Sequence, residues 1–276
     1  MRLNFPHHPR KRFGQNFLRD PQVIHHIIDA IHPEKEDRII EIGPGQGILT
    51  KSLLEVVDHL EVIEIDRDLA VQLNLNYAHT HQLTVHTNDV LQVDFNAFIA
   101  EPKNTRKLRV IGNLPYNIST PLIFHLLSFS PLLLDMHFML QKEVADRLVA
   151  APNQKQYGRL SIMAQYYCHI EPLFLVPPNA FYPSPKVQST FVRLIPHQSI
   201  PHPALNHSLF QEVTRTAFNQ RRKTLGNALK IYLNIEDFAA LKITPTLRPE
   251  TLSVADFVRI SNYIHGHPKL SSLEST

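Results

Sequence analysis

Three glycines at alternate positions, Gly43, Gly45 and Gly47, are the residues around which a ligand site is most readily built. They lie between an apolar, strand-like run and a helical pattern, and glycine lets the backbone turn sharply and approach a ligand closely. Their spacing is G-x-G-x-G, whereas a turn that places a pyrophosphate on a helix N-terminus needs G-x-G-x-x-G. Glu41 adds a carboxylate just before the turn. The spacing therefore differs from that of a pyrophosphate-binding turn; the alternative to a ligand site is a tight strand-to-helix turn that binds nothing.

This variant resembles the glycine turn of S-adenosylmethionine methyltransferases, whose cofactor carries an amino-acid end with an ammonium and a carboxylate. Glu64 stands nineteen residues after Gly45, about where a doubly wound fold places the carboxylate that binds ribose hydroxyls. Asp66 and Asp68 compete for that role, and Asp68 is also a candidate helix cap. Asp89, after a third strand, is suited to accept a hydrogen bond from the amino group of an adenine.

The sharpest motif is Asn113-Leu114-Pro115-Tyr116, which follows a fourth strand and has the form of an amino-methyltransferase signature. An exocyclic base amine is a poor nucleophile because its lone pair is delocalised into the ring. The Asn113 side-chain oxygen and the Leu114 carbonyl would accept its two hydrogens and aim the lone pair at a sulfonium methyl. Pro115 stiffens the turn, and Tyr116 offers a flat face to a base taken out of its stack. The alternative is a turn with a buried tyrosine.

A second aromatic face is expected from Phe181, which lies in a stiff, four-proline loop at residues 177–185. A flipped adenine would then rest between Tyr116 and Phe181, the alternative being a phenylalanine anchored in the core. Because Tyr116→Phe keeps the ring, we predict that this substitution is nearly silent unless the hydroxyl has a role of its own.

The elements that must position these residues alternate between strands and helices. Strands are predicted at residues 37–42, 60–66, 83–86 and 106–111, with helices at 49–57 and 69–78 between them. A helix at 21–31 begins at Pro21 with Asp20 as its cap, and one at 121–128 has Thr120 as its cap. The remaining predictions are a strand at 135–140, helices at 142–150 and 159–166, and strands at 168–176 and 189–194, the last one antiparallel.

Residues 196–203 are rich in proline and predict a linker to a helical C-terminal segment. Its helices are expected at 205–218, 222–233, 235–241 and 254–264. We therefore expect an α/β fold followed by a small helical domain.

Composition narrows the class of protein. The 276 residues are 43% apolar and 19% charged, as in an ordinary globular protein. No apolar run approaches the roughly 18 residues that span a bilayer, and the basic N-terminus lacks an apolar secretory core, so we expect a cytoplasmic protein without a membrane segment. The single Cys168 predicts no disulfide framework and argues against a cytosine C5-methyltransferase, which needs a cysteine nucleophile. The 17 histidines form no metal-ligand motif, so we expect no metal.

Positive charge is concentrated at two places although the net charge is only +3. The first nineteen residues contain no acid and include Arg10, Lys11 and Arg12, and residues 213–235 contain Arg221, Arg222 and Lys223. Basic clusters in a nearly neutral protein predict a face for a polyanion, here RNA, the alternative being solvated helix faces.

Five motifs together carry a resemblance to a known family: RKRFGQNFL, EIGPGQGILT, GNLPYNISTP, FYPSPKVQST and AFNQRRKTLGNAL. They resemble the bacterial small-subunit ribosomal RNA adenine N6,N6-dimethyltransferases over residues 10–258. The resemblance implies a Rossmann-like class I methyltransferase fold, with a seven-stranded sheet whose last strand is antiparallel, and a small all-helical C-terminal domain. It places the catalytic domain at 1–196 and an RNA- or ribosome-contacting domain at 197–276.

The resemblance also implies S-adenosylmethionine as cofactor, with contacts at Asn16, Leu18, Gly43, Glu64, Asp89 and Asn113. The implied substrate is a pair of adjacent adenines in the loop of the 3′-terminal hairpin of 16S rRNA, within a late assembly intermediate of the 30S subunit. A monomer is the default expectation. Two alternatives remain: a DNA adenine methyltransferase, which would usually show D-P-P-Y and a larger recognition segment, and a non-catalytic assembly or transcription factor on the same scaffold.

Overall fold

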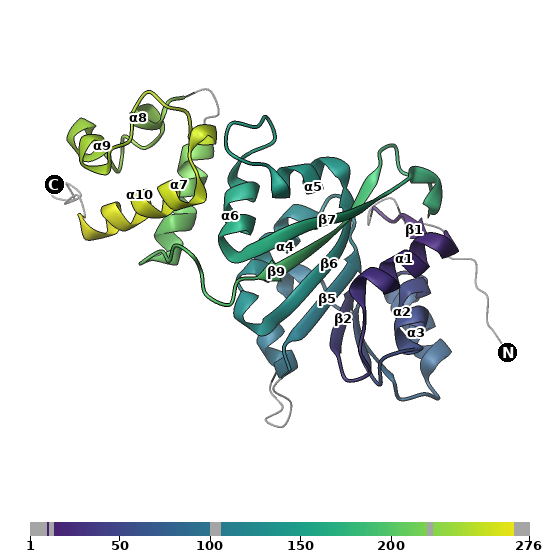
Figure 1. Cartoon of the computed structure of the whole chain (residues 1–276). Helices are drawn as coiled ribbons and strands as arrows, with labels where there is room; N and C mark the ends of the chain where they lie inside the picture. The colour runs from purple at the N-terminus through teal and green to yellow at the C-terminus, as the bar shows by residue number, and fades with distance from the viewer. Residues whose placement is uncertain (1–9, 11–13, 100–105, 220–222, 268–276) are drawn as a thin grey trace, which may run out of the picture. The chain divides into compact units, whose positions relative to one another are not determined.

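A computed structural model describes residue 10 and residues 14–99, 106–219 and 223–267 (Figure 1). The chain divides into two compact units, which we call unit 1 (Met1–Ala145 with Cys168–Pro196) and unit 2 (Asp146–Tyr167 with His197–Thr276). Unit 1 ends at residue 196, where the sequence predicted a domain boundary, but the segment 146–167 belongs with the C-terminal helices.

Unit 1 is built on a seven-stranded sheet with the order β4-β3-β2-β5-β6-β9-β7 (Figure 1). The strands are β2 (Arg38–Ile42), β3 (Leu60–Ile63), β4 (Leu83–His86), β5 (Leu108–Asn113), β6 (Leu133–Gln141), β7 (Cys168–Val176) and β9 (Ser189–Pro196). From β4 to β6 all neighbours are parallel, and β9 is antiparallel to both β6 and β7. The predicted seven-stranded sheet with an antiparallel last strand is confirmed.

The central strands β2 and β5 are buried on both faces, which explains their continuous apolar runs. From β2 the chain proceeds to β3 and β4 on one side, and it then returns to β5 on the other. The order of the strands therefore reverses beside β2. In open α/β sheets ligands bind at the carboxyl ends of the strands at such a point, so the fold itself indicates where the site lies.

One face of the sheet is covered by α1 (Pro21–Ile31), α2 (Ile48–Leu54) and α3 (Arg67–Tyr77). Their buried side chains pack with strand residues in a single apolar cluster that includes Ile27, Leu53, Leu73, Leu60 and Ile111. After β5 come α4 (Ser119–Leu127) and, after β6, α5 (Lys142–Val149). A separate two-stranded sheet pairs β1 (Phe17–Leu18) with β8 (Phe181–Tyr182).

The helix caps test the sequence predictions at single residues. The helix at 21–31 is confirmed, with the Asp20 carboxylate accepting hydrogen bonds from the amides at its start. Asp66, not Asp68, caps α3, because Asp66 has the extended backbone of a cap and its carboxylate accepts from the Asp68 amide. The predicted Thr120 cap is wrong: α4 begins at Ser119 and has no side-chain cap.

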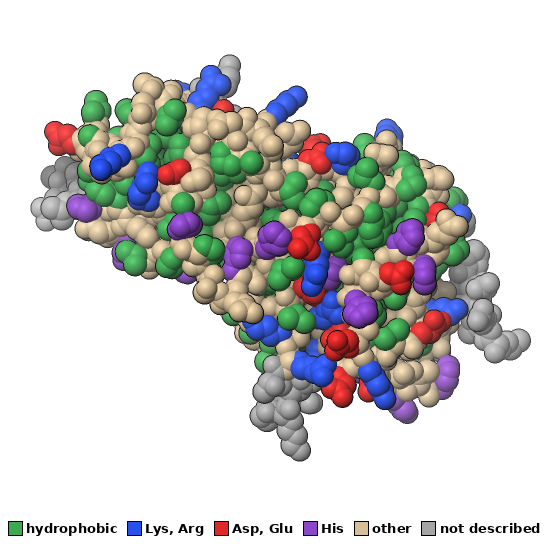
Figure 2. Space-filling view, in the orientation of Figure 1, with side chains coloured by type: hydrophobic (Ala, Val, Ile, Leu, Met, Phe, Trp, Pro, Cys, Tyr) green, Lys and Arg blue, Asp and Glu red, His purple; other side chains and the backbone are tan. Residues whose placement is uncertain are grey.

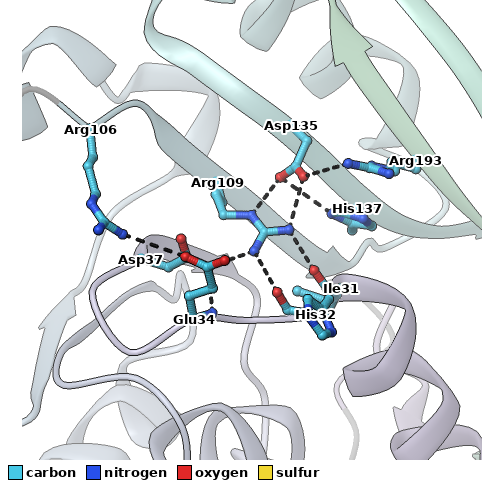
Figure 3. Close-up of polar contacts among 9 residues, drawn as sticks. All are labelled: Ile31, His32, Glu34, Asp37, Arg106, Arg109, Asp135, His137 and Arg193. Carbon is cyan, nitrogen blue, oxygen red and sulfur yellow. Dashed lines mark hydrogen bonds and ion pairs between the residues drawn. The ribbon is translucent and has the colours of Figure 1, made fainter.

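A buried polar cluster ties the amino end of the sheet together (Figure 3). The Arg109 guanidinium is 6% exposed and donates two hydrogen bonds to Asp135, at 2.9 and 3.0 Å. It also donates to Asp37 at 2.6 Å and to the Ile31 and His32 carbonyls at 2.6 and 3.3 Å. One side chain therefore joins the end of α1, the start of β2 and the strand β6. The cluster lies at the opposite end of β5 from Asn113.

Unit 2 is helical in its described part, with α6 (Arg159–Tyr167), α7 (His207–Phe218), α8 (Leu225–Ala228), α9 (Ile235–Leu241) and α10 (Val254–Gly266). The Tyr157 hydroxyl donates to the Leu252 carbonyl at 2.9 Å, and the Ala204 amide donates to the Tyr166 hydroxyl at 3.0 Å. These bonds explain why 146–167 packs with the C-terminal helices. Of the predicted helix at 222–233, only α8 is helical among the described residues. None of the helices in the described ranges is long and apolar enough to cross a membrane.

Candidate active site

A cavity of about 340 Å³ opens at the carboxyl ends of β2, β3 and β5, within unit 1. This volume is in the range of small-molecule sites, roughly 300–1,000 Å³. Five segments supply its lining: residues 14–18, 41–49, 63–65, 88–91 and 113–118. The predicted cofactor residues all line it, namely Asn16, Leu18, Gly43, Gly45, Glu64, Asp89 and Asn113. Segments predicted separately from the sequence thus meet in one place.

The glycine turn is conformationally restricted. Gly43, Gly45 and Gly47 all have left-handed φ angles, of 65°, 59° and 78°. A Cβ on Gly45 would lie 2.9 Å from the Phe17 ring, and one on Gly47 would lie 2.7 Å from Leu73. The turn therefore needs glycine both for its backbone angles and for its close packing.

Glu64 is the carboxylate that the geometry favours for ribose binding. It is 4% exposed, accepts a hydrogen bond from the Gly45 amide at 3.1 Å and another from the Asp66 amide at 2.9 Å. Burial raises its pKa, and these two amide bonds oppose that shift. A carboxylate has further lone pairs for ligand hydroxyls. The competitors are less suitable because Asp66 caps α3, both Asp66 and Asp68 pair with Arg10, and neither lines the cavity.

Glu41 contributes a second buried carboxylate to the lining. It is 2% exposed and accepts a hydrogen bond from the Thr50 hydroxyl at 2.6 Å. Burial raises its pKa to about 7. Two carboxylates lie at the turn, and one of them accepts a hydrogen bond from the Gly45 amide. Carboxylates at this position disfavour binding of a phosphate. The residues present fit a cofactor with an ammonium and ribose hydroxyls, such as S-adenosylmethionine.

The opposite part of the lining suits a purine ring. Asp89 is exposed and uses one carboxylate oxygen, Oδ1, to accept from the Leu91 amide at 3.0 Å. Ile48 and Ile65 line the same cavity and remain 37% and 46% exposed. Sequence analysis did not identify these apolar residues as part of the site, because isoleucine next to a strand is normally read as core.

The four residues of the signature all line the cavity beside the glycine turn. The Asn113 amide nitrogen donates to the Asn16 carbonyl at 2.9 Å, so the N-terminal segment fixes this side chain. The Leu114 side chain is buried, and the Ile118 amide closes a turn on the Pro115 carbonyl at 3.1 Å. The Tyr116 hydroxyl lies 3.1 Å from Ser189 Oγ. The arrangement places a polar side chain and a flat ring at one edge of the cavity.

Phe181 is not brought to this cavity. Its side chain is 4% exposed and belongs to the apolar core cluster, because β8 pairs with β1 and sets Phe181 opposite Leu18. The structure therefore shows the arrangement that sequence analysis considered as the alternative, an anchored phenylalanine. Its role as a second stacking face stays a prediction.

The predicted RNA-binding residues are only partly described. Arg10 forms ion pairs with Asp66, at 3.0 Å, and with Asp68, so its charge is matched within the protein. Lys223 is exposed. Lys11, Arg12, Arg221 and Arg222 lie outside the described residues. Among the described histidines, cysteines and acids, no group is arranged to bind a metal ion.

Comparison with known proteins agrees with this geometry. The family model for ribosomal RNA adenine dimethylases matches residues 6–266. The "Ribosomal RNA small subunit methyltransferase A" of Marinomonas sp. (strain MWYL1) is 54% identical over 259 residues, which cover 94% of this chain and 96% of that protein. The protein of the same name from Pseudomonas aeruginosa is 54% identical over 260 residues, covering 94% and 96%.

Solved structures show the same fold. A dimethyladenosine transferase from Plasmodium falciparum superposes with a TM-score of 0.74 at 26% identity, covering 88% of this chain and 95% of that one. The 23S rRNA methyltransferase ErmE superposes with a TM-score of 0.65 at 20% identity, covering 91% and 100%.

Proposed function

From the membership of this chain in the ribosomal RNA adenine dimethylase family, we propose that its substrate is the small-subunit, 16S ribosomal RNA. The chain is an rRNA adenine dimethyltransferase and uses S-adenosylmethionine. The finer proposal is that it dimethylates N6 of two adjacent adenines in the 3′-terminal hairpin loop, within a late 30S assembly intermediate, as a cytoplasmic monomer. The observation that supports methylation of an adenine amine is the cavity that joins Asn113–Tyr116 to Glu64 and the glycine turn, and the choice of RNA target rests on the resemblance of the sequence motifs.

Binding and positioning follow from the residues that line the cavity. S-adenosylmethionine supplies an electrophilic methyl on a sulfonium. Glu64 would bind its ribose and Asp89 its adenine amino group, and the glycine turn with Asn16 and Leu18 would enclose its amino-acid end. The apolar residues Ile48 and Ile65 exclude water from the ring, which strengthens the polar contacts.

The target adenine is held by the signature. Tyr116 stacks on the flipped base, which has left its own helix. The Asn113 side-chain oxygen and the Leu114 carbonyl would accept the two amine hydrogens and so orient the nitrogen lone pair. No general base is needed before attack, because an amine can lose its proton after it has been alkylated. The protein therefore acts chiefly by orientation.

Methyl transfer from tritiated S-adenosylmethionine tests the proposal on three substrates. We expect transfer to under-methylated 30S particles, weaker transfer to naked 16S rRNA, and none to duplex DNA. Mapping the product should place four methyl groups on two adjacent adenines. Preferred transfer to DNA would favour a DNA methyltransferase, and binding to 30S particles without transfer would favour a non-catalytic assembly factor.

A further inference from the structure

The far end of the Tyr116 ring and its backbone are both held by contacts from outside the signature. The Tyr116 hydroxyl lies 3.1 Å from Ser189 Oγ, and the Tyr116 carbonyl accepts a hydrogen bond from Ser119 Oγ at 3.2 Å. The χ2 energy profile of tyrosine is broad, and its hydroxyl oxygen lies on the χ2 axis, so a partner on the hydroxyl does not set the plane of the ring. Such a partner instead fixes where the far end of the ring lies, and with it the direction of the ring axis.

Ser189 is well suited to be that partner because its position is fixed. It is 0% exposed and is the first residue of β9, where its backbone pairs with Gln141 of β6 and Val176 of β7. The residue before it is also anchored, since the Lys142 amide donates to the Gln188 carbonyl at 3.0 Å. A short side chain on a buried strand loses little rotamer entropy when it makes a hydrogen bond.

The Tyr116 hydroxyl is suited to hydrogen bonding and not to proton transfer. Burial raises its pKa above the ordinary value of 10.0, and the bond to Ser189 only partly opposes that shift. The hydroxyl is therefore protonated at neutral pH. Its partner belongs to the FYPSPKVQS motif, which sequence analysis valued for Phe181 and not for this serine.

We propose that Ser189 is a positioning residue, whose hydroxyl holds the far end of the Tyr116 ring at the place where the target adenine stacks. The inference rests on the proposed function, because it presumes that Tyr116 receives a flipped adenine. It replaces the expectation that Tyr116→Phe is nearly silent. Removing either partner of the bond should loosen the platform, so Ser189→Ala and Tyr116→Phe should have the same consequence.

A double-mutant cycle tests this. Single-turnover methyl transfer to under-methylated 30S particles is measured for the unsubstituted protein, Ser189→Ala, Tyr116→Phe and the double variant. Each single variant should transfer about fivefold more slowly, the loss expected for one neutral hydrogen bond. The double variant should also be about fivefold slower and not about twenty-five-fold, because both changes remove one interaction. S-adenosylmethionine affinity should not change in any of them.

Thr190→Val is the matched control. Thr190 is the next residue on β9, its hydroxyl is buried, and it has no hydrogen-bond partner among the described residues. This control should transfer methyl groups at the unsubstituted rate. A 2-aminopurine probe at the target position should report unchanged base flipping for it. The probe signal should fall for Ser189→Ala and for Tyr116→Phe.

The outcomes separate the two claims. Unsubstituted rates for Ser189→Ala, or additive losses in the double variant, would overturn the positioning role and leave the proposed function intact. If neither the unsubstituted protein nor any variant transfers methyl groups to an rRNA substrate, the proposed function and the positioning role are both overturned. If Ser189→Ala does not fold, Tyr116→Phe tests the same bond from its half-exposed side.

Discussion

Asn113 presents the two ends of its amide to different partners. Its nitrogen donates to the Asn16 carbonyl at 2.9 Å, and a carbonyl can only accept, so the orientation of the amide is determined by its neighbour. The side-chain oxygen therefore faces away from Asn16, at a residue that lines the cavity. Such an oxygen is preorganised to accept an amine hydrogen, and it needs no rearrangement when the substrate arrives.

Asn113→Ala should therefore affect transfer more than binding. An acceptor that strengthens its contact as the amine becomes tetrahedral acts on the transition state, so single-turnover transfer should fall by about 10²–10³. Binding to 30S particles should hardly change, since phosphate contacts and shape dominate that affinity. Asn96→Ala, an exposed asparagine outside the cavity lining, is the control. Transfer at the unsubstituted rate under saturating cofactor would show that the motif is only a turn.

Glu64→Ala should weaken S-adenosylmethionine without unfolding the protein. Losing charged hydrogen bonds to the ribose should cost roughly 1.5–3 kcal/mol per bond, and the Gly45 and Asp66 amides lose their acceptor as well. Calorimetry should show at least about tenfold weaker binding, since about 1.4 kcal/mol is tenfold. The control is Glu61→Gln, which changes a carboxylate within β3, the strand that Glu64 follows, and this carboxylate pairs with His86 instead. Unchanged affinity, with a loss on Asp68→Asn, would assign the ribose to the competing acid.

At the scale of the element, sequence patterns located strands and helices better than their ends. The helix at 21–31, the strand at 83–86 and the helix at 235–241 are confirmed to the residue. The helix expected at 49–57 ends at Leu54, although Val57 is still buried. Periodicity reports which side chains face the core, and a residue beyond the last helical turn can still face it.

The same limit applies to the site. The glycine turn, Glu64, Asp89 and the signature were identified because parallel strands end at one edge, which makes their loops neighbours. Three features depended on pairings between distant segments, which the sequence alone does not determine. Burial of Phe181 follows from the β1–β8 pair, the charge of Arg10 is matched across fifty-six residues, and Ser189 reaches Tyr116 across seventy-three.

The junction of β2 and α2 predicts a pH dependence of stability. Glu41, at the end of β2, is bonded to Thr50 in α2, and burial raises its pKa from 4.5 to about 7. The folded protein then keeps a proton that the unfolded chain releases above pH about 4.5. By linkage, this contribution to stability is complete below that pH and is lost as pH rises through about 7.

Glu41→Gln should remove that loss. Between pH 5 and 8, the free energy of unfolding of the cofactor-free protein should fall by on the order of 2–3 kcal/mol more than that of the variant. Urea unfolding at several pH values measures the difference. Glu55→Gln, an exposed glutamate after α2, should follow the unsubstituted protein. Parallel curves for Glu41→Gln and the unsubstituted protein would show that Glu41 stays charged in the fold.

At the scale of the whole molecule, charge is balanced. The face shown in Figure 2 carries acidic, basic and histidine side chains interspersed near the amino ends of β2, β5 and β6. Exposed ion pairs in unit 1 include Lys35 with Asp58 and Arg106 with Glu36. Net charge alone therefore gives little attraction to RNA, and a local cluster has to supply it. The acid-free runs at residues 1–19 and 213–235 are the sequence features from which we predict that attraction.

Charge reversal of Arg221, Arg222 and Lys223 should weaken 30S binding and reduce its dependence on salt. Each phosphate contact releases condensed counterions, so losing Z contacts should lower the slope of log affinity against log salt by roughly 0.7–0.9 per contact. Affinity for S-adenosylmethionine should not change, because Lys223 belongs to unit 2 and the cofactor cavity to unit 1. Filter binding at several salt concentrations measures the slope, and calorimetry measures the cofactor affinity.

The matched control reverses three exposed lysines of unit 1, Lys35, Lys51 and Lys107, with the same change in net charge. Equal losses in both triple variants would reduce the effect to net charge, and unchanged slopes would make the cluster a solvated surface; only a selective loss assigns it to the RNA backbone.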